Sequence, residues 1–164
     1  MTTCYPDTMK VKRDIQRRIE DYVIKYCETL EENFKQYSID SYKRNIDHPT
    51  EVSKGYTSYY EEQLQKIEDG TANLYKFVFK TGKKFHKVYF LQYEEASEYY
   101  GTKAGYKSGS VHAFIDKNTG EVYKPASWKA PAKHVRFDLR IIREREFLLN
   151  PKNCDWAGGH LYMR

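Results

Sequence analysis

The spacing of hydrophobic positions along the 164-residue chain changes near residue 70, which divides the sequence into a helical part and a strand-rich part. Apolar residues recur every three or four positions over residues 8–37, which predicts one long amphipathic helix capped by Asp7 or Thr8. An exposed apolar stripe does not stabilise an isolated helix, so the helix packs on the rest of the chain or on a second copy in a homodimer. We interpret residues 38–56, which lack a clear period, as a loop.

A second, shorter helix is predicted over residues 57–69. Thr57 or Ser58 can serve as its N-cap, and Glu61 follows Ser58 at the spacing of a capping box. Gly70 is expected to end the helix in a left-handed conformation.

Beyond residue 70 the sequence favours β-strands joined by short turns, with a polar loop over 94–109. Asp116 is expected to bond the backbone of the turn DKNTG, and Gly120 to take its left-handed position. A two-proline segment, 125–131, is predicted to be an edge or a loop, because proline cannot donate to a sheet. The strands are expected over residues 74–80, 85–93, 110–116, 121–124 and 135–141.

The C-terminal end is predicted to hold a short helix over residues 143–149 and a last short strand within DWAGGHLYM. The predicted fold class is therefore α+β, with two N-terminal helices packed on an antiparallel sheet of about five strands. We expect a helical part over 1–70 and a basic, aromatic-rich β part over 71–164 within one compact domain.

Charge is distributed unevenly between these two parts. Residues 1–70 hold 11 Lys and Arg against 14 Asp and Glu, whereas residues 71–164 hold 17 against 9. The net charges are thus −3 and +8, and the basic part is also rich in the chain's 16 tyrosines. This pairing favours an anionic partner such as nucleic acid, a nucleotide or an acidic protein surface, although solvated lysines also serve solubility.

Two basic clusters carry the candidate binding site. The first interleaves cations with Tyr123, Trp128 and Phe137, and the second surrounds the predicted turn KTGKK. Ammonium and guanidinium groups attract phosphates, and aromatic faces stack on bases. Alternatively, Trp128 is a core residue, the lysines are merely solvated, and Arg136 and Arg140 form an ion-pair ladder with Asp138 rather than a phosphate clamp. The candidate ligand-binding residues are Lys124, Ser127, Trp128, Lys129, Lys133, Arg136, Arg140, His112, Lys84 and Lys87, with Lys80 and Lys83 completing the second cluster.

Catalytic and metal-binding patterns are weak in this sequence. The five histidines are scattered, and the three cysteines, Cys4, Cys27 and Cys154, have no metal-ligand spacing. His112 and His134 are the residues that a hydrolase would use, but nothing converges on either of them. We therefore expect a non-enzymatic protein without a metal or cofactor. Neither a signal peptide nor a membrane-spanning run is apparent, so we expect no membrane partner and a cytoplasmic location.

The segments SVHAFIDKNTGEVYKPASWKAPA, from Ser110, and DWAGGHLY, from Asp155, resemble a family of small uncharacterised proteins encoded by tailed bacteriophages. The resemblance covers residues 74–164 and leaves out the two helices, which look specific to this chain. It implies a viral accessory product of the host cytoplasm and carries over no activity or functional residue, although small basic phage proteins often bind nucleic acid or disable a host defence protein. The leading hypothesis is therefore a protein that binds nucleic acid or a nucleotide through its basic part. The alternatives are an anti-defence inhibitor of a host protein, of the anti-CRISPR kind, a protein that sequesters a nucleotide signal and, less favoured, a virion component.

Overall fold

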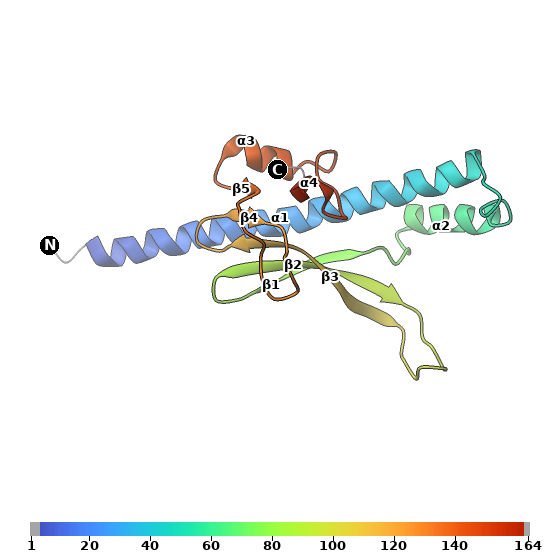
Figure 1. Ribbon diagram of the computed structural model, residues 1–164, viewed down its shortest axis with the longest axis horizontal. Coiled ribbons are helices and arrows are strands. Elements are labelled where there is room, and N and C mark those ends of the chain that lie inside the picture. Colours follow the sequence, from blue (N-terminus) through green and yellow to red (C-terminus); the bar gives the residue numbers. More distant parts are fainter. Residues whose placement is uncertain (1–3, 163–164) are drawn as a thin grey trace.

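A long helix, α1 (Cys4–Asp47), runs through the whole molecule and carries the other elements along its length (Figure 1). The computed structural model describes the backbone of residues 4–162 and the side chains of residues 8–162. A helix of 44 residues is about 65 Å long at 1.5 Å per residue. The predicted bounds 8–37 were wrong at both ends: the helix starts at Cys4, and after Pro6 in its first turn no glycine or proline follows before Pro49.

The second helix, α2 (Thr57–Asp69), lies alongside the C-terminal end of α1, where the rings of Tyr42 and Tyr60 are 5.9 Å apart. This packing supports the part of α1 that the sequence pattern assigned to a loop. The helix is preceded by Tyr56 as its N-cap and has no side-chain cap, so the predicted capping box was wrong. Gly70 ends it at φ 76°, as predicted.

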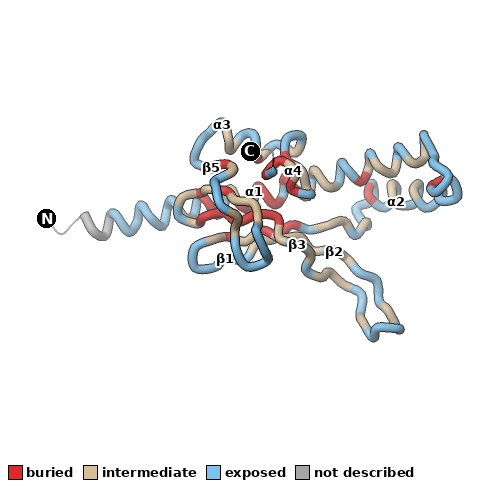
Figure 2. Tube along the Cα trace, in the orientation of Figure 1, coloured by how far each residue is buried: buried red, intermediate tan, exposed pale blue. Residues whose placement is uncertain are grey.

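The five strands form one antiparallel sheet in which each strand pairs with the next one along the chain. This order confirms the α+β class. The outer parts of the second and third strands extend beyond the sheet as a two-stranded arm (Figure 2), which corrects the predicted loop over 94–109. The strands are β1 (Lys76–Thr81), β2 (Phe85–Glu94), β3 (Gly105–Asp116), β4 (Glu121–Tyr123) and β5 (Phe137–Asp138).

The core lies between α1 and one face of the sheet. The middle of α1 buries an apolar stripe at spacings of three and four residues: Ile19, Val23, Tyr26 and Leu30. Against it lie inward-facing sheet residues, which include Phe77, Val88, Ala113, Ile115 and Val122. The opposite face of the sheet is not covered by a helix, which leaves room there for the candidate site (Figure 1).

After β4 the chain leaves the sheet as a loop, as its two prolines predicted. Pro125 and Pro131 pair with each other in an isolated antiparallel bridge. The predicted strand over 135–141 was largely wrong, because only Phe137 and Asp138 pair with β4 and both Val135 and Ile141 are exposed. Asp138 accepts the backbone N–H of Arg140, which turns the chain out of the sheet.

Two short helices finish the chain: α3 (Ile142–Leu148), close to its predicted place, and α4 (Gly159–Tyr162), where a strand was expected. The side chain of Asp155 explains why α4 is a helix. Its carboxylate accepts the backbone N–H groups of Ala157 and Gly159, at 2.9 and 3.2 Å. This capping arrangement favours a helical turn over an extended chain.

Candidate anion-binding site

A hollow of about 420 Å³ opens on the face of the sheet away from α1, and lysines surround it. We call it the basic hollow. It brings Lys129 of one basic cluster next to the lysines of the other, because β2 of the first hairpin pairs directly with β3 of the second. Its lining residues are Lys80, Thr81, Gly82, Lys83, Lys84, Phe85, Lys87, Phe114 and Lys129.

The strand register explains why lysines and phenylalanines meet in the basic hollow. Lys80 of β1 is the direct cross-strand partner of Lys87 of β2, and Lys87 in turn pairs with Phe114 of β3. The rings of Phe85 and Phe114 are in edge contact at 5.9 Å. Two like charges directly opposite each other in a sheet are destabilising. The fold therefore tolerates an unfavourable pair at this place, which an anion between the two ammonium groups would make favourable.

The loop over 125–131 brings Trp128 and Lys129 to the rim of the basic hollow. Lys87 fixes this loop, because its Nζ donates to the carbonyl of Trp128 at 2.9 Å and lies 4.4 Å from the centre of the indole ring. Tyr89 contacts the same ring, at 5.7 Å between centroids. Trp128 is 45% exposed, so the alternative that it fills the core was wrong.

Ser127 shapes this loop. Its hydroxyl oxygen accepts the backbone N–H of Lys129 at 3.2 Å, which turns the chain toward the basic hollow. Ser127 itself lies beside Trp128 in a smaller neighbouring depression of about 250 Å³. The structure thus places Ser127, Trp128, Lys129, Lys84 and Lys87 in one region.

No lysine of the basic hollow forms an ion pair with another described residue. Within residues 8–162 the ion pairs lie elsewhere, on α2, on the arm and around Arg140, and none involves a lysine of the hollow. The positive charge gathered there has no ion-pair partner among the described residues, which favours an anionic ligand.

The other candidate residues are not part of this hollow. Arg140 donates two hydrogen bonds to the carboxylate of Asp138, at 3.2 and 3.0 Å, and lies 3.8 Å from Glu121. The hydrogen bonds to Asp138 chiefly raise the pKa of Arg140. This arrangement is the ion-pair alternative rather than the phosphate clamp. Arg136 precedes the two-residue strand β5, so Arg136 and Arg140 do not share a strand face.

Lys124 and Lys133 lie outside the basic hollow as well. The Nζ of Lys124 is 4.4 Å from the centre of the Tyr162 ring, which directs it toward α4. Lys133 is exposed on the loop next to His134, a residue with φ 73°. Both lysines can contribute to the general positive field, but neither lines the hollow.

His112 lies in the core, on the side of the sheet that faces α1. The hydroxyl of Tyr26 is 2.9 Å from Nε2 of His112 and 2.7 Å from Nε2 of His160, and all three side chains are buried. The backbone N–H of Asp155 donates to Nδ1 of His160, so Nε2 of His160 carries the proton and donates to Tyr26. The hydroxyl of Tyr26 then donates to His112.

We call Tyr26, His112 and His160 the buried clasp, since they join α1, β3 and α4. Burial lowers the pKa of His112 to about 3 and that of His160 to about 4, which keeps both rings neutral. The clasp thus gives a structural reason for the histidines in the segments SVHAF and AGGH. His112, a candidate ligand contact, is separated from the lysines by the sheet.

The described residues offer little for catalysis. Cys27 and Cys154 are buried free thiols, and burial raises the pKa of each to about 12, which disfavours the reactive thiolate. Among residues 8–162 no group of three or more His, Cys, Asp or Glu could hold a metal ion. The side chain of Cys4 lies outside the described part.

Analysis of the sequence missed other cations at this end of the molecule. Lys117 follows β3 and its Nζ donates to the carbonyl of Gly82, in the turn between β1 and β2, at 3.3 Å. The start of α1 is also basic. The net charge of residues 1–70 did not show this, because acidic residues later in that range outweigh the cations. Counting charge over single helical turns would have found it. The cations concerned are Lys10, Lys12, Arg13, Arg17 and Arg18.

A family model, described as a family of unknown function (DUF7717), matches residues 3–163. The chain belongs to this family. The match includes both N-terminal helices, so the expectation that they are specific to this chain was wrong. Neither the curated proteins nor the solved structures contain a match. Within the described part of this DUF7717 member, no helix is long and apolar enough to cross a membrane.

Proposed function

We propose that this member of the DUF7717 family is a non-enzymatic protein that binds the phosphates of nucleic acid in its basic hollow. The observation that carries the proposal is the convergence of five lysines, four from the β1–β2 hairpin and one from the loop over 125–131, on a single hollow, with no ion pair to a carboxylate among the described residues. Lysine ammonium groups bind phosphate as point charges.

Aromatic residues beside these lysines fit the same ligand. Trp128 has an exposed ring next to Lys87, and Phe85 and Phe114 line the hollow. Unpaired bases stack on such rings in many nucleic-acid-binding proteins. A free nucleotide also fits a hollow of about 420 Å³, which is within the size range of small-molecule sites.

Nucleic acid is favoured over a nucleotide by the number of charges. A nucleotide carries about two to four negative charges. The five lysines of the hollow and Lys117, which donates to Gly82 of its lining, carry more positive charge than one nucleotide neutralises. A polyanion that continues past the hollow neutralises all of them.

Following the resemblance to proteins of tailed bacteriophages, we propose that the protein is a phage accessory product that acts in the host cytoplasm. An anti-defence inhibitor that meets an acidic host protein is the alternative.

The test is fluorescence anisotropy of labelled single-stranded and duplex oligonucleotides, with a nucleotide panel followed by calorimetry. The variant Lys80→Gln/Lys84→Gln/Lys129→Gln removes three cations of the basic hollow. It leaves Lys87 in place, because that side chain holds the loop through Trp128. A matched control with the same change in charge is Lys25→Gln/Lys35→Gln/Lys43→Gln, on exposed positions of α1.

We expect the hollow variant to lose at least tenfold in affinity for oligonucleotides at 0.1 M salt, and the control variant less than threefold. Circular dichroism checks that both variants keep the fold. If the protein binds nucleotides alone, the hollow is a small-molecule site and the nucleic-acid proposal is wrong. If it binds neither, and instead captures one acidic protein that survives nuclease treatment, the inhibitor alternative replaces it.

A further inference from the structure

The N-terminal part of α1 extends beyond the sheet (Figures 1 and 2). All positions from 8 to 15 are exposed, and Ile19 is the first buried residue of the helix. Gln16 contacts the sheet, because its Nε2 donates to Asn118 in the β3–β4 turn at 2.6 Å. Residues 9–18, which we call the free helix end, span about 15 Å at 1.5 Å per residue.

The free helix end is strongly basic. It holds five cations against the single acid Asp14, a net charge of +4, and none of its side chains takes part in an ion pair of the described structure. At 100° per residue, Arg13 and Arg17 lie on the side opposite Ile15. Like charges four residues apart destabilise a helix by a few tenths of a kcal/mol, roughly. The cations are Lys10, Lys12, Arg13, Arg17 and Arg18, which surround the helix.

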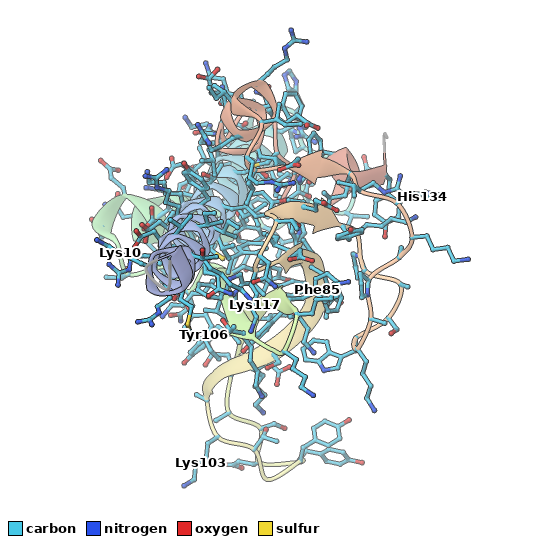
Figure 3. All side chains as sticks on the ribbon, turned by 90° about the vertical axis from the view of Figure 1, so that its left-hand side faces the viewer. Lys10, Phe85, Lys103, Tyr106, Lys117 and His134 are labelled. Atoms are coloured by element: carbon cyan, nitrogen blue, oxygen red, sulfur yellow. The ribbon has the colours of Figure 1, made fainter. Side chains whose placement is uncertain are left out.

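More cations lie where the free helix end meets the sheet. Lys117, next to Asn118, donates through its backbone N–H to the carbonyl of Lys84 at 3.0 Å and through Nζ to that of Gly82. This ties the β1–β2 turn, with Lys83 and Lys84, to the β3–β4 turn beside α1. Figure 3 looks along the molecule from this end, with Lys10 on one side of the helix, and Lys117 and Phe85 on the other.

We propose that the free helix end enters the major groove of duplex DNA, while the lysines at its base and in the basic hollow hold the flanking phosphates. This rests on the proposed nucleic-acid function and names its substrate. The major groove of B-form DNA is about 12 Å wide and 8.5 Å deep, which admits one α-helix. A helix enters the groove with its exposed side, and the positions from 9 to 15 are all exposed. The deep, narrow major groove of duplex RNA does not admit a helix.

A second copy of the chain is the competing occupant, because Val11 and Ile15 continue the apolar stripe past the end of the core and stay exposed. Charge opposes this dimer. Two free helix ends that pack together bring a net +4 against another +4, whereas DNA offers one negative charge per about 1.7 Å of its axis. In the groove, the same apolar side chains can contact thymine methyl groups.

The experiment compares the wild-type protein with the variant Arg13→Gln/Arg17→Gln/Arg18→Gln on a mixed-sequence DNA duplex of 20 base pairs, its single strand and the corresponding RNA duplex. The matched control is again Lys25→Gln/Lys35→Gln/Lys43→Gln, which removes three cations from the same helix outside the free end. We expect the variant to lose at least tenfold in affinity for duplex DNA at 0.1 M salt, and less than threefold for the single strand. The wild-type protein should protect guanine N7, in the major groove, from methylation.

Several results would overturn this inference. Unchanged affinity for duplex DNA in the free-end variant, together with a loss in the hollow variant, would refute the groove contact and leave the proposed function intact. Unchanged affinity in both variants would refute the proposed function as well. Protection of adenine N3 instead of guanine N7 would place the protein in the minor groove. A dimer that Val11→Ser/Ile15→Ser dissociates would show that a second copy covers the helix.

Discussion

The substitution Tyr26→Phe tests the buried clasp by removing a single oxygen atom. That oxygen accepts from Nε2 of His160 and donates to Nε2 of His112, so the substitution leaves one donor and one acceptor without a partner. Both histidines are buried, and their rings keep the same neighbours because the phenyl ring retains the packing of tyrosine. The change therefore isolates the hydrogen bonds from the hydrophobic contribution.

The expected cost follows from these two groups. A buried polar group left unpaired costs about 1–3 kcal/mol, so the loss of two partners should lower the free energy of unfolding by about 2–6 kcal/mol. Small domains are stable by about 5–15 kcal/mol, so the variant should still fold and be measurable. The assay is urea denaturation at pH 7.5, followed by tryptophan fluorescence and circular dichroism.

The matched control is Tyr37→Phe, because the side chain of Tyr37 is half exposed and water replaces its hydroxyl. Its effect should stay within about 0.5 kcal/mol. If Tyr26→Phe costs no more than this control, the hydroxyl does not bridge the two histidines. The assignment of their protons would then be wrong.

Three further predictions follow. Burial lowers the pKa of both clasp histidines below the value of about 6.5 in the unfolded chain, so stability is fully present above that pH and falls as the pH drops toward 4. The loss between pH 6.5 and 5 should be ~2 kcal/mol per histidine in urea titrations, and His160→Gln should halve it. Gly109→Ala should cost about 1–3 kcal/mol, because a Cβ there would clash with the Phe90 ring. Arg140→Gln should leave DNA affinity within twofold, since carboxylates already neutralise that guanidinium.

Each of these predictions has a control or a contradicting result. A pH profile as steep in His160→Gln as in the wild type would show that another group titrates. Gly55→Ala is the control for Gly109→Ala, because nothing lies within 4 Å of a Cβ at Gly55, and its cost should be close to zero. A tenfold loss of DNA affinity in Arg140→Gln would show that Arg140 binds phosphate rather than serving only in its ion pairs.

The sequence predicted the structural features that depend on a local residue pattern. The middle of the apolar stripe of α1, the left-handed Gly70 and the turn that Asp116 bonds were confirmed, since each depends on neighbours within a few residues. The C-terminal end of α1 was predicted too early because packing on α2 stabilises residues that lack a hydrophobic period of their own.

The candidate site was predictable only in part. Lys84 and Lys129 are 45 positions apart in the chain, and only the pairing of β2 with β3 brings them together. The buried clasp depends on Tyr26 and His160, 134 positions apart, and no local spacing indicates such a contact. The exposure of Trp128 depends on the contact of its loop with Lys87.

Binding of a labelled DNA duplex across salt concentrations from 0.05 to 0.3 M tests the central claim most directly. If the five lysines of the basic hollow contact phosphates, log K should fall with log salt with a slope of about −4 or steeper, at roughly −0.9 per contact. A flat dependence, or no binding at the lowest salt, would contradict the account. The basic hollow would then be an ordinary solvated surface.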